Sequence, residues 1–347
     1  MFQNSEYERM TPAYKAKYDT MLEKILSLQL TFQMTGISFD DCSDLFLKIL
    51  HDHPEIFWLR LNTSGRSKRS ENALEFTTFL REGIRLENIP SMQAELENEV
   101  ERLVENVRPL TLYARILYVH DYIVDHTSYT FTPNCYGAYG CLVEHQAVCA
   151  GYSCAFQLVL TRLRIPCGRT EGSKKDESSG ETNHEWNYVL INNNYYYIDV
   201  TWDDPHFSGE NEKYKTHEYF CLSERDLLRS HRIDRSTYYV PSCNSNRYNY
   251  YTYKGYYIGF YSFYAASNSI RTQMRNGGLY TLKFVNPEET RKAVENLVNR
   301  QRIYELLKDV AGITYYVSKS GVILSIKTYS EDRPARSGGF TVISRTR

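Results

Sequence analysis

The sequence predicts an α+β fold built from more than one packed unit. Apolar residues three and four positions apart, the pattern of amphipathic helices, dominate roughly the first half of the chain. Alternating apolar and polar residues separated by turn residues, the pattern of strands, recur in the second half. At 347 residues the chain also exceeds the size that one hydrophobic core usually organises.

We expect three regions from these patterns. Residues 1–106 form a mainly helical region, residues 107–237 form a core that carries the candidate chemistry, and residues 238–347 form a tyrosine-rich hairpin and a small α+β subdomain. In the first region the patterns predict helices within Glu6–Met34, Phe39–His51 and Ser91–Val107 and strands over Ile56–Leu61 and Ala73–Leu80. This first region contains no obvious catalytic motif.

The core begins with a predicted helix over Leu112–Asp125. Within it, His120 and Asp121 are neighbours that point about 100° apart on a helix, so we expect structural roles for them rather than an acid/base pair. The following stretch, Phe131–Cys141, contains proline and glycine and predicts a loop that approaches Cys149.

Cys149 precedes a segment of helical spacing, with apolar residues at Tyr152, Phe156, Val159, Leu160 and Leu163. We therefore expect its sulfur in the first turn of a helix, where unpaired backbone N–H groups and the helix dipole favour a thiolate. Cys154 lies about 140° further round the same helix, and we expect it to be structural.

His184 and Asp199 fall on two predicted strands of one hairpin. A two-residue loop at Asn193–Asn194 would place their backbones roughly 13 Å apart. A three-residue loop would place them on opposite faces of the sheet. A four-residue loop, Ile191–Asn194, pairs Trp186 with Asp199 and brings Asp199 to a diagonal of about 7 Å from His184 on the same face. Only this last register lets the two side chains meet.

Three ordered blocks of the core resemble the transglutaminase-like superfamily in its bacterial branch. They are Ala147–Tyr152, His184–Asn187 and Tyr197–Asp204, with further similarity at His120–Val124, Tyr139–Val143 and Tyr219–Ser223. The resemblance covers roughly residues 107–232. It implies a papain-like fold in which Cys149 is the nucleophile, His184 the base and Asp199 the residue that orients His184. Members of the family act as transglutaminases, proteases, deamidases and peptide-processing enzymes.

Taken separately, Cys149 could be a core cysteine, His184 a core histidine and Asp199 a turn residue. Their joint order and compatible register favour a catalytic triad that attacks a carboxamide or peptide bond and forms a thioester. We expect the backbone N–H of Cys149 in the oxyanion hole, a second donor from Phe131–Cys141, and Trp202 as a shield by analogy. This chemistry needs no cofactor. Hydrolysis and transfer to an amine both stay open, and the expected partner is a protein or peptide substrate, including cell-wall peptide.

The alternative function is a non-catalytic peptide- or glycan-binding module on the same fold. Its surface would be Tyr248–Tyr264, where eight of seventeen residues are tyrosine and Lys254–Gly255 predicts the turn of a hairpin. Before His184, the polar stretch Glu171–Glu181 predicts a solvated loop that overhangs the site. Near the C-terminus the patterns predict a strand over Leu279–Val285, a helix over Pro287–Val310 and strands over Ile313–Val317 and Val322–Thr328.

The composition argues against several other classes of function. The chain has 41 basic and 42 acidic residues and no dense basic run, so we expect neither nucleic acid nor an anionic membrane as partner. No stretch approaches 18 consecutive apolar residues and Met1–Met10 does not resemble a signal peptide, so we expect no membrane span and a cytoplasmic protein unless an export signal has been trimmed. The eight cysteines include no C-x-x-C pair, which gives little support for a metal site.

Overall fold

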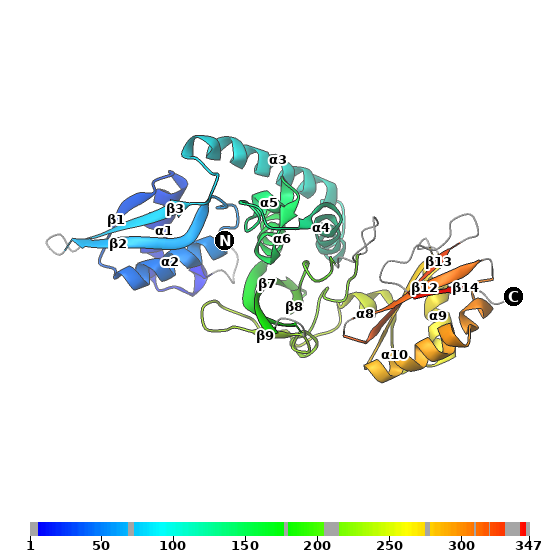
Figure 1. Cartoon of the computed structure of the whole chain (residues 1–347). Coiled ribbons are helices and arrows are strands. Elements are labelled where there is room, and N and C mark those ends of the chain that lie inside the picture. Colours follow the sequence, from blue (N-terminus) through cyan, green and yellow to red (C-terminus); the bar gives the residue numbers. More distant parts are fainter. Residues whose placement is uncertain are drawn as a thin grey trace. The chain divides into compact units, whose positions relative to one another are not determined.

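The computed structural model describes residues 6–68, 73–176, 180–204, 215–274, 278–308, 310–318, 320–329 and 341–344. The chain divides into two compact units (Figure 1), Met1–Asp203 with Leu222–Ser245 and Asp204–Cys221 with Asn246–Arg347. Each unit mixes helices with strands, which confirms the predicted α+β class. The finer division into three regions stays a prediction. No described helix combines the length and the apolar character needed to cross a membrane.

The N-terminal part of the first unit packs helices against a three-stranded antiparallel sheet of order β1-β3-β2. Its elements are η1 (Tyr7–Arg9), α1 (Pro12–Leu26), β1 (Thr31–Thr35), α2 (Phe39–Asp52), β2 (Leu59–Lys68), β3 (Ala73–Leu80), η2 (Leu86–Asn88) and α3 (Ile89–Val107). The helix predicted to extend to Met34 is wrong beyond Leu26. Leu28 has a φ of 59°, which breaks the helix, and Phe32 and Met34 then alternate with exposed residues as a strand with one buried face.

The central helix of the first unit is α6 (Cys149–Arg162), which begins at Cys149 as predicted. Its residues from Gly151 to Leu160 are all buried, because α4 (Leu112–His126) and α5 (Ala138–Leu142) pack on part of its surface and strands pack on another part. The expected loop Phe131–Cys141 therefore ends early, where α5 begins. A short parallel pairing of β4 (Ser128–Tyr129) with β5 (Gln146–Ala147) leads the chain into α6.

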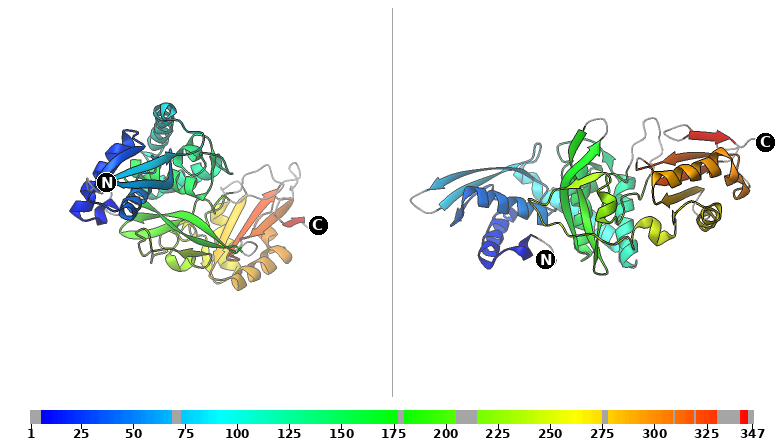
Figure 2. Two further views of the ribbon diagram at one scale, coloured as in Figure 1. Left: turned by 60° about the vertical axis from the view of Figure 1, so that its left-hand side comes forward. Right: turned by 90° about the horizontal axis from the view of Figure 1, so that it is seen from below.

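The strands that follow, drawn in green to yellow-green in Figure 2, form an antiparallel sheet. This sheet has four strands in the order β8-β7-β6-β9. They are β6 (Cys167–Asp176), β7 (Gly180–Ile191), β8 (Asn194–Ile198) and β9 (His231–Ile233), and the short helix α7 (Glu224–Leu227) precedes β9. The solvated loop expected over Glu171–Glu181 is wrong, since these residues continue β6 and β7 and only 177–179 lie outside the described residues. β6 pairs with β7 on one side and with β9 on the other, so backbone hydrogen bonds hold a polar strand that has little apolar burial.

β7 and β8 meet in a two-residue turn, Asn192–Asn193, rather than in the four-residue loop expected. Both turn residues have a positive φ, 46° and 64°, which asparagine tolerates and which suits the twist of a hairpin. The predicted register is confirmed: Asn187 pairs with Ile198, so the next pair along places Asp199 opposite Trp186. The loop is shorter than expected because Ile191 and Asn194, which were assigned to it, pair with each other instead.

The second unit contains a five-stranded sheet of order β10-β11-β13-β12-β14. Its elements are α8 (Tyr250–Lys254), β10 (Tyr257–Gly259), α9 (Phe263–Gln273), β11 (Leu279–Phe284), α10 (Pro287–Ala293), η3 (Val294–Asn299), η4 (Arg302–Glu305), β12 (Gly312–Val317), β13 (Ile323–Tyr329) and β14 (Thr341–Ser344). The single helix predicted over Pro287–Val310 is wrong in its second half. It widens into a π-helical turn at η3 and ends before Gln301, whose φ is 55°.

The tyrosine-rich hairpin predicted within Tyr248–Tyr264 is also wrong. Its first half forms α8, because Gly255, with a φ of 76°, ends that helix as a left-handed C-cap instead of turning a hairpin. Its second half supplies β10, which pairs in parallel with β11, and then α9 begins at Phe263. The cross-strand aromatic surface expected for a binding module does not form among these described residues.

Candidate active site

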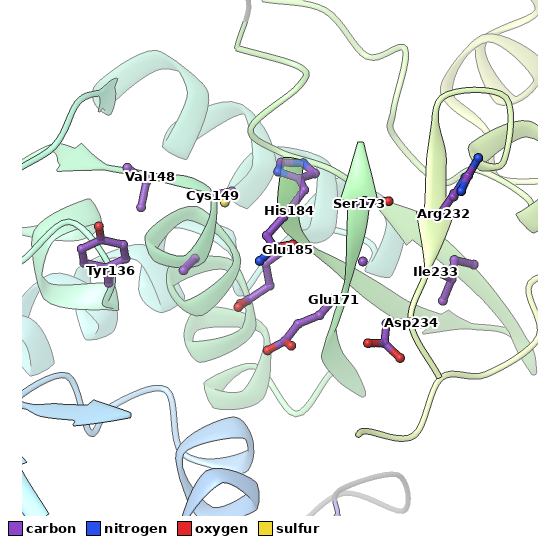
Figure 3. A pocket seen from close by; sticks show the side chains of 13 residues that line it. Tyr136, Val148, Cys149, Glu171, Ser173, His184, Glu185, Arg232, Ile233 and Asp234 are labelled. Carbon is purple, nitrogen blue, oxygen red and sulfur yellow. The ribbon is translucent and has the colours of Figure 1, made fainter. Parts of the chain in front are cut away.

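Cys149 opens α6 and lines a cavity of about 650 Å³ (Figure 3). The backbone before it is held in place, since the N–H of Val148 donates to the carbonyl of Cys135 at 3.0 Å. Gly151 passes so close to the same carbonyl that a Cβ there would lie 2.3 Å from the Cys135 oxygen. Packing therefore requires glycine two positions after Cys149, which gives a physical reason for the Cys-Ala-Gly motif.

His184 lies on β7, and Asp199 follows directly after β8. Nε2 of His184 is 2.6 Å from Oδ2 of Asp199, and Oδ1 of Asp199 accepts the backbone N–H of Trp202 at 3.1 Å. The Cys149 sulfur lies near enough to His184 to raise the pKa of its imidazole, and because Nε2 faces Asp199, Nδ1 is the ring nitrogen left for sulfur. Cys149 is half-buried, whereas the side chains of His184 and Asp199 are buried. The fold thus brings the three predicted residues into one line, in which Asp199 contacts His184 and His184 neighbours Cys149.

The charged forms of His184 and Asp199 stabilise each other. Burial alone would lower the pKa of His184, but the Asp199 carboxylate and the Cys149 sulfur outweigh burial and raise that pKa to about 9. Burial opposes ionisation of Asp199, yet the positive charge and hydrogen bonds of His184, together with those of His231, hold the pKa of Asp199 well below its ordinary value. At neutral pH, Asp199 is therefore ionised and His184 is protonated. A protonated imidazole beside a sulfur favours the thiolate.

His231, on β9, is a site residue that sequence reasoning missed. Its Nε2 lies 3.1 Å from Oδ2 of Asp199, and its Nδ1 lies 2.8 Å from Oγ of Ser230. His231 falls within the stretch that resembles the family, but it follows Asp199 by 32 positions, so no spacing rule connects the two. Trp202, the expected shield, has its ring centroid 5.9 Å from that of His184 and 4.5 Å from that of His231.

The cavity wall carries more negative than positive side chains among the described residues. Figure 3 shows Tyr136 and Val148 on the Cys149 side and the residues of the β9 end on the far side. Besides Cys149 and His184, the lining residues are Tyr136, Val148, Ala150, Glu171, Gly172, Ser173, Asn183, Glu185, Arg232, Ile233 and Asp234. The lining thus includes three carboxylates and one arginine.

A buried arginine holds Glu185, the neighbour of His184, from behind. Nη1 of Arg169 lies 3.0 Å from Oε1 of Glu185 and 2.9 Å from Sγ of Cys154, and Nη2 donates to the carbonyl of Leu50 at 2.8 Å. Burial raises the pKa of the Cys154 thiol to about 11. Cys154 therefore has the low reactivity that its predicted structural role requires.

The prediction that His120 and Asp121 do not face each other is wrong. Nδ1 of His120 lies 2.9 Å from Oδ1 of Asp121, and its Nε2 lies 3.1 Å from Oδ2 of Asp203. The contact with Asp203 orients the ring so that its other nitrogen reaches the neighbouring carboxylate. Burial opposes protonation, but the two carboxylates raise the pKa of His120 to about 9. The structural role expected for this histidine stays a prediction.

His184, Asp199 and His231 also form a group whose ligand atoms lie within 4.8 Å of one another, close enough to hold a metal ion. Both imidazoles direct Nε2 at the same carboxylate oxygen, so the three side chains satisfy one another by hydrogen bonding. Thiol chemistry at Cys149 does not require a metal at this position. The expectation that the site works without a metal or cofactor stays a prediction.

Residues 100–200, which contain Cys149, His184 and Asp199, match the family model described as the transglutaminase-like superfamily. The chain has a transglutaminase-like core. The match to residues 100–200 confirms the resemblance to the transglutaminase-like superfamily found in the sequence. No curated protein sequence matches the chain.

Two solved structures are similar to the chain that carries this transglutaminase-like core. One is a candidate cysteine protease from Cytophaga hutchinsonii, with 14% identity over 40% of this chain and 61% of that one and a TM-score of 0.27. The other is a TGase, with 12% identity over 52% of each chain and a TM-score of 0.29. The chain thus spans less than two thirds of either protein, and at these TM-scores neither likeness bears on its activity.

Proposed function

We propose that the transglutaminase-like core is a thiol-dependent enzyme that transfers the acyl group of a carboxamide or peptide bond. The observation that carries the proposal is the line Cys149–His184–Asp199 at the wall of an open cavity, in which His184 is hydrogen-bonded to Asp199 and neighbours Cys149. The half-buried thiol is placed to reach a substrate, while the imidazole and carboxylate are buried behind it. A nucleophile, a base within reach and an orienting group behind the base are what this chemistry needs.

In the first half-reaction the sulfur of Cys149 attacks the carbonyl carbon and a C–S bond forms. His184 gives its proton to the leaving nitrogen as the C–N bond breaks, which releases ammonia or an amine and leaves a thioester. In the second half-reaction the now neutral His184 takes a proton from water or from an amine as that group attacks the thioester. The C–S bond breaks, and the product is a carboxylic acid or a new amide.

Asp199 stays ionised through both half-reactions and keeps Nδ1 of His184 directed at sulfur. The start of α6 supplies a positive field for the oxyanion, and the backbone N–H of Cys149 is the proposed donor. The loop before α5, whose Tyr136 lines the cavity, is the proposed source of a second donor. Trp202 is proposed to shield His184 from bulk water, since its ring lies beside the imidazole.

The proposed substrate is a protein or peptide. A cavity of about 650 Å³ falls within the range of pockets that hold small ligands or side chains. A glutamine side chain, a peptide bond and a cell-wall peptide are each candidates for the acyl donor, and water and an amine are the candidate acceptors.

The test is intact-mass analysis of the protein and of a glutamine-containing peptide, incubated with and without a primary amine. We expect a thioester adduct on the protein, and a peptide that is either deamidated or joined to the amine. Cys149→Ala should form no adduct while keeping its cooperative thermal transition, and Cys154→Ala, a matched change on the same helix, should still form it. A wild-type protein that modifies neither glutamine peptides nor peptide bonds would contradict the proposal and favour a non-catalytic binding module.

A further inference from the structure

We propose that His231 is a positioning residue that holds Asp199, so that Asp199 in turn holds His184. The inference rests on the proposed function and adds a fourth residue, from β9, to the line that begins at Cys149. His231 is completely buried, and its Nε2 lies 3.1 Å from the same carboxylate oxygen that His184 contacts at 2.6 Å.

The protonation states of the three side chains determine the direction of these hydrogen bonds. Burial, helped by the positive charge of His184, lowers the pKa of His231 despite the opposing effect of Asp199, so His231 is neutral at pH 7 and carries one N–H. An ionised carboxylate can only accept, so that N–H belongs to Nε2 and points at Asp199. Nδ1 is then the unprotonated nitrogen, and it lies 2.8 Å from Oγ of Ser230.

A single partner would leave the carboxylate of Asp199 free to rotate about its side-chain bonds. The backbone N–H of Trp202 holds Oδ1, while His231 and His184 hold Oδ2. These donors come from β7, from β9 and from the turn after β8, so rotation of the carboxylate breaks bonds to separate segments. The result is a fixed acceptor, which fixes the ring of His184 and its second nitrogen.

The surroundings of His231 keep its own ring in place. Its ring centroid lies 4.9 Å from that of Trp186, edge to face, and 4.5 Å from that of Trp202. β9 pairs with β6, with Lys174 opposite His231, so the backbone of the histidine is part of the sheet that carries His184. The imidazole therefore cannot leave Asp199 without opening a cavity between two tryptophans.

The test compares His231→Gln, His231→Asn and His231→Phe. A glutamine amide nitrogen can occupy the place of Nε2 and donate to Asp199, whereas an asparagine nitrogen lies near the place of Nδ1 and phenylalanine has no donor. The first measurement is the rate at which iodoacetamide alkylates Cys149 at pH 7, because it needs no substrate. The Asn and Phe variants should be alkylated about 10–100-fold more slowly, the typical cost of losing a supporting partner, and the Gln variant within about threefold of wild type.

Turnover gives the second measurement: kcat should fall with the alkylation rate while KM stays within about twofold, since His231 does not touch the substrate. His51→Phe is the matched control. It makes the same change at another buried histidine, whose Nε2 contacts the backbone carbonyl of Arg169, and it should lower Tm while alkylation of Cys149 proceeds at the wild-type rate.

The inference is overturned if the Asn and Phe variants are alkylated at the wild-type rate. It is equally overturned if Gln is as slow as Asn at a similar Tm, because a donor at the Nε2 position then has no effect. If Phe does not fold, the Gln–Asn pair decides. Alkylation rates that follow the expected order in a protein that turns over no carboxamide would leave the positioning role standing and contradict the proposed reaction alone.

Discussion

Asp199 is a buried carboxylate that keeps its charge. Hydrogen bonds from His184, His231 and the backbone of Trp202 replace the water that it lost on folding, without which a buried charge is very costly. The set is complementary only when Asp199 is ionised, His184 is protonated and His231 is neutral. These protonation states place the proton for the leaving group on His184.

We predict that turnover falls as pH rises through about 9. The pKa of His184 is raised from 6.5 to about 9, so the ring is protonated at pH 7 to 8 and loses the proton for the leaving group above that range. The stability that this shift contributes is fully present below about 6.5 and is lost as pH rises through about 9. The profile of kcat/KM between about pH 6 and 10.5, with Tm at each pH, tests both effects. A rate that still rises at about pH 10 would show that turnover does not need protonated His184.

At the scale of elements, the β7–β8 hairpin sets the distance between His184 and Asp199. A register slip of one residue would turn His184 to the opposite face of the sheet and break the line. The turn at Asn192–Asn193 selects the register, since both residues adopt the left-handed conformation that a two-residue hairpin requires.

Substitution of Asn193, with its φ of 64°, tests this role of the turn. Asn193→Gly should leave the free energy of unfolding within about 1 kcal/mol of wild type, because glycine adopts this conformation freely. Asn193→Val should lower it by about 1–2 kcal/mol, the cost of a left-handed conformation for a residue with a bulky Cβ. Urea denaturation of both variants gives the two values. Equal stability of the Val and Gly variants would show that the turn does not select the register.

At the scale of the molecule, the C-terminal end of α2 docks on the transglutaminase-like core within the first unit. The guanidinium of Arg169 donates a hydrogen bond to the carbonyl of Leu50, at the negative end of the α2 dipole. Gln157 of α6 donates to the carbonyl of His51 at 3.1 Å, and Nε2 of His51 lies 3.1 Å from the carbonyl of Arg169. Arg169 also contacts Glu185, the neighbour of His184, so one side chain links the end of α2 to the active site.

We expect Arg169→Met to lower the free energy of unfolding by about 3–5 kcal/mol, because it leaves Glu185 without its cation and the carbonyl of Leu50 without its donor. The double variant Arg169→Met/Glu185→Gln should recover part of that loss, since it removes the unpaired charge. Urea denaturation of wild type, both single variants and the double variant gives the coupling energy. A loss below about 1 kcal/mol in Arg169→Met would mean that the arginine does not join these segments.

Local patterns were sufficient to predict much of the site. Helical spacing predicted that α6 starts at Cys149. Of the three hairpin registers compared, the one that lets His184 and Asp199 meet is the one observed, although its turn is shorter than expected. Each of these features depends on residues a few positions apart, and periodicity records such short-range geometry. The catalytic roles of the three residues are still proposals.

The sequence by itself determined where the nucleophile helix and the hairpin lie, because dihedral preferences and burial patterns act over a few neighbouring residues. Only the tertiary structure decided that Glu171–Glu181 continues two strands and that the tyrosine-rich stretch begins with a helix, since a polar strand depends on its sheet partners and aromatic runs suit either structure. It alone placed His231 against Asp199. That contact exists because β9 pairs with β6, and pairing between distant segments is set by packing of the whole unit.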